Sequence, residues 1–143
     1  MANPRDTVSF VGIDPVNVTF KIDNSTITYS ATAKGGSSQI GLAVTFSADD
    51  TVALTADGDA VVGKLLFVSA DNKCTVQIEG GMTLPGGASA TLTRGSAIVG
   101  ALGASSAKGY IRSAASGTAA ELVKARGMIF NNADTANVAV FLS

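Results

Sequence analysis

Histidine and tryptophan are absent from this chain of 143 residues, and cysteine occurs once, at Cys74. Without histidine the chain lacks the usual general base near neutral pH and the commonest metal ligand. A single cysteine excludes an internal disulfide and a cysteine-based zinc site. No Gly-x-Ser-x-Gly element is present to supply a nucleophile. We therefore predict that the protein is not an enzyme and binds no cofactor.

Charge is also scarce, since charged residues make up 15% of the chain and the formal net charge is −1. No basic field is available to hold a nucleic acid, so we predict no nucleic-acid partner. Residues 1–7 have no apolar core of signal-peptide length, and no apolar run is long enough to span a membrane. We expect no membrane partner, synthesis in a cytoplasm, and any exterior location to be reached by assembly.

Residues 57–85 contain the pattern around which the chain is organised. An acidic turn, Asp57-Gly58-Asp59, leads into the apolar run 61–68, and a second turn at 70–72 sends the chain back through 73–79. Residues of the return arm alternate between apolar and polar, with Cys74 on the apolar face, which indicates a half-buried strand. We predict a β-hairpin in which Gly80 and Gly81 break the alternation and Pro85-Gly86-Gly87 ends the pattern.

Other extended segments follow at short intervals, separated by turn residues. We predict a second hairpin from 16–22 and 26–31, further strands at 40–46, 51–54, 90–93, 96–102 and 108–113, and a closing pair at 126–130 and 137–142. Residues 33–38 are predicted to be a flexible loop, and 118–125 the one short helix. About ten short strands indicate an all-β barrel or sandwich. Residues 1–143 would form a single domain, with 1–15 as an extended N-terminal arm.

Two apparent binding motifs are better explained as structure. Gly58 to Leu65 fits the phosphate-loop spacing G-x-x-x-x-G-K, but Leu65 replaces the metal-binding hydroxyl and the glycines precede a strand instead of a helix. The carboxylates of Asp49, Asp50, Asp57 and Asp59 would bind Ca²⁺ only if two turns met in space, and their spacing fits no EF-hand loop. Turn capping is the simpler interpretation of these acids.

Several stretches of the second half resemble the head-decoration, or capsid cement, proteins of tailed bacteriophages. These stretches are Asp57–Asp59 with Val62-Gly63-Lys64-Leu65, the return segment 72–77, the strand 81–85 that ends in Leu84-Pro85, and the closing pair 126–130 and 138–142 with its Arg126-Gly127 start. The resemblance covers residues 40–143 and rests on the order and spacing of these pieces. Residues 1–38 have no counterpart in it, and the Ala- and Gly-rich stretch 95–120 departs from the usual pattern.

The resemblance implies a structural virion protein, made in the cytoplasm of a host bacterium and located on the capsid exterior. It would bind the outer surface of the shell and bridge neighbouring major capsid proteins after the shell expands. It implies a homotrimer, with a dimer as the alternative, and open strand edges would favour such assembly. We expect the apolar patch Val8, Phe10 and Val11 of the arm to contact the capsid by strand addition.

Two other classes of β-rich protein fit the same pattern. A phage tail-tube, spike or fibre protein would also be rich in strands and poor in sites. A sugar- or ligand-binding β-sandwich is the other alternative. Such modules usually present exposed aromatic residues, whereas most of the eight Phe and Tyr side chains here are predicted to face inward.

Overall fold

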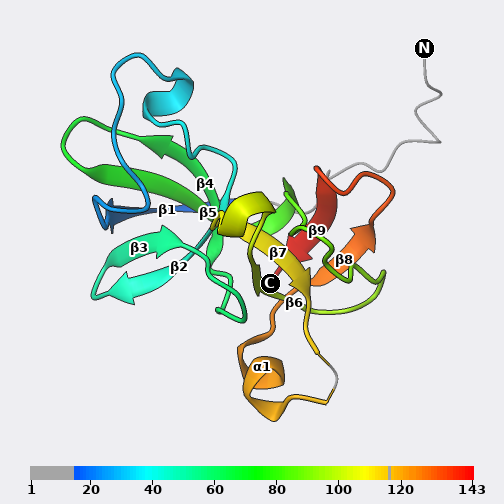
Figure 1. Ribbon diagram of the computed structural model, residues 1–143. Helices are drawn as coiled ribbons and strands as arrows, with labels where there is room; N and C mark the ends of the chain where they lie inside the picture. Colours follow the sequence, from blue (N-terminus) through cyan, green and yellow to red (C-terminus); the bar gives the residue numbers. More distant parts are fainter. Residues whose placement is uncertain (1–14, 116) are drawn as a thin grey trace.

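The computed structural model describes residues 15–115 and 117–143, and this part of the chain forms nine strands with three short helices among them (Figure 1). The strands are β1 (Val16–Ile22), β2 (Ala43–Ala48), β3 (Thr51–Leu54), β4 (Gly63–Val68), β5 (Lys73–Leu84), β6 (Ile98–Ala101), β7 (Tyr110–Ser113), β8 (Met128–Asn131) and β9 (Val138–Leu142). One α-helix, α1 (Ala119–Lys124), and the 3-10 helices η2 (Lys34–Gly36) and η3 (Ala104–Ser106) complete the set. The predicted all-β class and the short helix near 118–125 are confirmed. Of the predicted N-terminal arm, only Pro15 lies within the described residues.

Strand β5 is the hub of the fold. It pairs antiparallel with β4 and with β1 through its first half, and with β9 through its second half. The β4–β5 hairpin predicted from the sequence is confirmed, with Asn72 at φ 63° in its turn. Asparagine tolerates this left-handed conformation better than most residues, which explains its place there.

Five strands close into a ring at one end of the molecule. Their order is β1-β3-β2-β4-β5, and β1 pairs with both β3 and β5, so that the first strand meets the last. A ring of this kind satisfies its backbone without free edges and encloses a core between its inward side chains. That core is apolar and consists of Ile22, Ile27, Val44, Val52, Leu54, Leu65, Val68, Cys74 and Val76.

A second apolar core lies beyond Gly80, where β5 pairs with β9 and β9 pairs with β8. It includes buried residues of β5, β6, β7, β8 and β9: Met82, Leu84, Ile98, Ile111, Ile129, Val138, Val140 and Leu142. Gly80 and Gly81 were predicted to break the pattern of the return strand, but they lie within one continuous strand that ends just before Pro85. Gly80 adopts φ 101°, which favours glycine, and the strand continues through it to Leu84. One twelve-residue strand therefore serves both cores.

The predicted hairpin between 16–22 and 26–31 is also wrong, because only its first half is a strand. The Asp23 carboxylate accepts hydrogen bonds from the backbone N–H groups of Ser25, Thr26 and Ile27 at 3.0–3.3 Å, which curls the chain away from β1. The Thr26 hydroxyl then accepts the Leu54 N–H at 2.9 Å. Side-chain bonding of this type competes with strand pairing. Strand β1 pairs with β5 instead.

Three other segments differ from the sequence-based expectation. Residues 40–42 form a turn before β2, and 90–93 form a loop in which the Thr91 carbonyl accepts the Ser113 N–H at 2.8 Å. In the predicted flexible loop 33–38, the helix η2 packs against β4. A Cβ on Gly36 would lie 1.8 Å from the Val68 carbonyl oxygen, so only glycine allows this contact.

The outer edges of the later strands are covered by neighbouring loops. Strand β7 bonds with the backbone of Pro85, Gly87 and Thr91, strand β6 with Gly58, Asp59 and Arg126, and strand β8 with Gly95 and Ser96. The strand edges of β6, β7 and β8 are therefore not open, and they give no support to the expectation that open edges favour self-association. No helix within the described residues has the length and apolar character needed to cross a membrane.

Candidate functional site

A groove of about 1080 Å³ lies between the loop after β5, strand β7 and helix α1. Its walls come from the loop residues 88–96, the end of β6, residues 112–115, and the segment that begins α1. Small and hydroxyl-bearing side chains dominate the lining, among them Ser89, Thr91, Thr93, Ser96 and Ser113. Among the described residues that line the groove, the charged ones are Asp57, Arg112 and Glu121.

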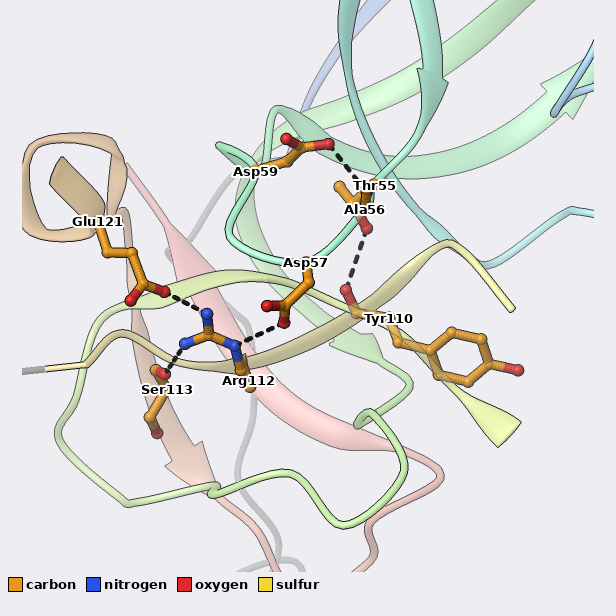
Figure 2. A network of polar contacts seen from close by, with 8 residues as sticks. All are labelled: Thr55, Ala56, Asp57, Asp59, Tyr110, Arg112, Ser113 and Glu121. Atoms are coloured by element: carbon orange, nitrogen blue, oxygen red, sulfur yellow. Dashed lines mark hydrogen bonds and ion pairs between the residues drawn. The ribbon is translucent and has the colours of Figure 1, made fainter. Parts of the chain in front are cut away.

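Arg112 lies at the centre of this charged cluster, as Figure 2 shows. It points away from the second core because its neighbours Ile111 and Ser113 on β7 are buried. Its Nε donates to Asp57 Oδ1 at 2.9 Å, its Nη1 donates to the Ser113 carbonyl at 3.1 Å, and its Nη2 forms an ion pair with Glu121. The hydrogen bond to Asp57 raises the pKa of Arg112, and the contact with Glu121 adds to this effect against the burial that lowers the pKa.

The acidic turn is held to β7 and β6 by a set of polar bonds. Asp59 accepts the Ala56 N–H at 2.9 Å, and the Thr55 hydroxyl donates to the Tyr110 carbonyl at 3.0 Å (Figure 2). The Gly58 N–H donates to the Gly100 carbonyl at 2.9 Å. The turn predicted at 57–59 precedes the β4–β5 hairpin. These bonds hold it in place, and its Asp57 forms part of the groove wall.

Within the described residues, the carboxylates of Asp49, Asp50, Asp57 and Asp59 do not gather into a calcium site. Asp49 and Asp50 lie at the β2–β3 turn, whereas Asp57 binds Arg112 and Asp59 caps its own turn. Within residues 15–115 and 117–143, no three acidic or thiol side chains gather into a group suited to a metal ion. The phosphate-loop spacing is likewise structural, since Gly63 begins β4 and no helix follows the glycines.

Cys74 lies in the core of the strand ring and is 2% exposed. Burial raises the pKa of its thiol to about 11, which leaves almost no thiolate at neutral pH. The expected inward position of Cys74 is confirmed.

We predict that Cys74 in the native protein reacts with a disulfide reagent at pH 8 about 100-fold more slowly than in the unfolded chain, because reaction requires opening of the core. The rate of thionitrobenzoate release, with and without guanidinium chloride, measures this difference. Equal rates in both conditions would show that the strand ring does not protect this residue.

A second polar cluster joins the two cores, and we call it the Arg126 junction. Arg126 donates to the Val62 carbonyl at 2.6 Å, to the Ile78 carbonyl at 2.5 Å and to the Ser143 carbonyl at 3.2 Å. Burial lowers the pKa of this guanidinium. The side chain thus connects the start of β4, the middle of β5 and the end of β9.

Two glycines allow close backbone packing beside this junction. A Cβ on Gly63 would lie 2.0 Å from the Gln77 carbonyl oxygen. A Cβ on Gly127, whose φ is 69°, would lie 2.4 Å from the Phe141 carbonyl oxygen. Both glycines, like Arg126, belong to the stretches that resemble decoration proteins, so at these three positions the resemblance reflects packing.

The prediction that most aromatic side chains face inward is wrong for the described residues. Phe46 and Phe67 are about half exposed, and Tyr29 is 41% exposed. The register of the β4–β5 pair shifts between Leu65 and Phe67, and such a bulge re-aims a side chain that simple alternation places inside. The ring of Phe46 lies at the end of β2 and meets Phe20 edge-on at 5.2 Å between centroids.

The expected capsid-contact residues Val8, Phe10 and Val11 lie outside the described residues. Sequence reasoning missed both the groove and the exposed apolar residues of α1, where Leu122 is 50% and Val123 87% exposed. The available signal was the pair of apolar residues inside a short, otherwise polar or alanine-rich helix. Comparison with family models, with curated proteins and with solved structures found no match to this chain.

Proposed function

We propose that this chain is a structural virion protein that attaches to the outer surface of a tailed-phage head. It bridges neighbouring major capsid proteins and stabilises the expanded shell. It acts as a homotrimer, with a dimer as the alternative, and its location is the capsid exterior.

The observation that carries this proposal is how the resembling stretches are used in the fold. The strand from Gly63, the return strand and its Leu84-Pro85 exit, and the closing pair from Arg126 all meet around β5 and the Arg126 junction. These stretches are spread over 80 residues of the sequence, yet they belong to one scaffold. We expect such an arrangement when two proteins share a fold, and not when the likeness arises by chance.

The chemistry of the groove also favours binding over catalysis. The Ser96 and Ser113 hydroxyls bond with each other at 2.6 Å, and Ser113 also accepts the Thr93 N–H at 2.9 Å. Arg112 is engaged by two carboxylates. A protein that works by attachment in many copies relies on shape and repeated contact, so it needs no reactive group.

Co-sedimentation with purified heads tests the proposal. We expect saturable binding to expanded heads and little binding to unexpanded heads, because the bridged surface forms on expansion. Binding to purified tails, with none to expanded heads, would instead favour the tail-tube, spike or fibre alternative and would overturn the proposal.

We propose that Val8, Phe10 and Val11 supply the capsid contact. Replacing all three with serine is expected to weaken binding to expanded heads by at least about tenfold, because strand addition needs apolar side chains to fill pockets on the partner. The same co-sedimentation assay measures this loss. The melting temperature of the variant is measured alongside, and an unchanged value would show that the loss of binding does not come from unfolding.

The matched control is Val123→Ser, which removes an exposed apolar side chain elsewhere on the molecule. It is expected to leave head binding unchanged. Undiminished head binding by the triple variant would refute a role for these three residues.

A further inference from the structure

The segment that carries helix α1, residues 117–125, stands apart from the strands and borders the groove (Figure 1). Gly117, Thr118 and Glu121 form its contribution to the groove wall. We refer to residues 117–125 as the α1 segment.

Packing contributes little to the position of the α1 segment. None of the six helical residues is buried, and Leu122 and Val123 face solvent. A Cβ on Gly117 would meet nothing within 4 Å. Helices of this length are marginal in water and normally depend on a buried face, which α1 lacks.

Backbone hydrogen bonding also leaves the α1 segment separate from the rest of the molecule. Within the described residues, its backbone N–H groups bond inside the segment or, for Thr118, to the adjacent Ala115 carbonyl. The flanks, by contrast, are tied to β6 and to the residue before it, since Arg126 exchanges two bonds with Ile98 and Ala114 donates to the Ala97 carbonyl. The segment therefore has firmly held ends and a middle without backbone attachment.

The ion pair between Glu121 and Arg112 is the polar link from the α1 segment to the strands. Glu121 is 15% exposed, and its Oε1 atom has no hydrogen-bond partner among the described residues besides this ion-pair contact. Arg112 is held in place independently by Asp57 and by the Ser113 carbonyl. If the contact with Glu121 breaks, Asp57 still neutralises the guanidinium of Arg112 and, with the Ser113 carbonyl, still orients it. The Glu121 carboxylate then becomes hydrated.

We propose that the Arg112–Glu121 pair is a latch that holds the α1 segment against the groove, and that the segment detaches as a unit when this pair breaks. Local opening of this kind requires few buried contacts and little backbone bonding to the body, and both conditions are met here. Detachment opens the groove on the side of Thr118 and frees Nη2 of Arg112. The latch thus controls access to the groove.

Glu121→Ala and Asp57→Ala separate the latch from a general weakening of the charged cluster. Each removes one carboxylate from Arg112, but only the first removes a contact of α1. Alanine has a higher helix propensity than glutamate. Faster amide hydrogen exchange in Glu121→Ala therefore does not come from a lower helix propensity of the new residue. In the full chain, we expect Glu121→Ala to speed amide hydrogen exchange across residues 117–125 by at least about tenfold, and Asp57→Ala by less than about twofold.

A nitroxide spin label on Val123→Cys gives a second measurement that does not depend on exchange rates. Cys74 is buried, so the label attaches at the new cysteine alone. We expect the label to give a restricted spectrum in the parent and in Asp57→Ala, and a mobile spectrum in Glu121→Ala. Amide hydrogen exchange in β7 should stay unchanged in Glu121→Ala. An unchanged exchange rate at 117–125 in Glu121→Ala, or equal effects of the two variants, would overturn the proposal.

Discussion

Replacement of Arg126 with methionine is expected to lower the free energy of unfolding by about 3 kcal/mol, because two part-buried carbonyl groups lose their donors. The Val62 and Ile78 carbonyls accept from Arg126 at 2.6 and 2.5 Å, and methionine fills similar space without donating. Urea unfolding followed by circular dichroism measures the loss. Since Arg126 connects β4, β5 and β9, the transition should remain cooperative and move to lower urea.

Arg94→Met is the matched control, because Arg94 is exposed in the loop before β6. Surface substitutions of this kind usually change stability by less than about 0.5 kcal/mol. If Arg126→Met were as mild as Arg94→Met, the Arg126 junction would not be what joins the two cores.

Gly63→Ala is expected to cost at least about 3 kcal/mol, because the added methyl group has no space. Its Cβ would lie 2.0 Å from the Gln77 carbonyl oxygen and 2.8 Å from the carbonyl carbon, both backbone atoms that cannot rotate away. Strand β4 would have to move from β5 at the point where the strand ring meets the second core. Thermal and urea unfolding of the variant measure the cost.

Gly117→Ala provides the comparison, since its Cβ would meet nothing within 4 Å. It should be neutral or slightly stabilising, because alanine restricts the unfolded chain more than glycine does. A similar, small effect at both positions would contradict the close approach of β4 and β5 on which the hub description rests.

The parts of the fold that could be predicted from the sequence are those set by local pattern. Alternation of apolar residues around Cys74 identified the central strand, and the Asp71-Asn72 turn identified its pairing with β4. The short helix near 118–125 was predicted for similar reasons, from a run of good helix formers. Each of these features depends on residues that are close together in the chain.

Features that depend on distant residues could not be predicted in the same way. Asp23 terminates β1 through its own side-chain bonds, and β1 then takes β5, more than 50 residues away, as its partner. The Asp57–Arg112 contact joins residues 55 positions apart, and nothing in either local pattern indicates it. The outward aim of Phe67 follows from a bulge in the β4–β5 register, which simple alternation cannot reveal.

The resembling stretches are explained by packing more fully than by binding. Gly63, Arg126 and Gly127 are needed for close backbone contacts and for buried carbonyl groups. Under the proposed function, the contact with a capsid is therefore expected outside these stretches, and the proposed residues are Val8, Phe10 and Val11. Binding defects and folding defects should consequently arise from different sets of substitutions.

Electron cryomicroscopy of expanded heads saturated with the protein tests the central claim most directly. The proposal predicts added density on the outer surface of the shell, repeated at the boundaries between neighbouring major capsid proteins, with the two-core β domain fitting each copy. Heads without added density, or density confined to the tail, would contradict the assignment as a capsid decoration protein.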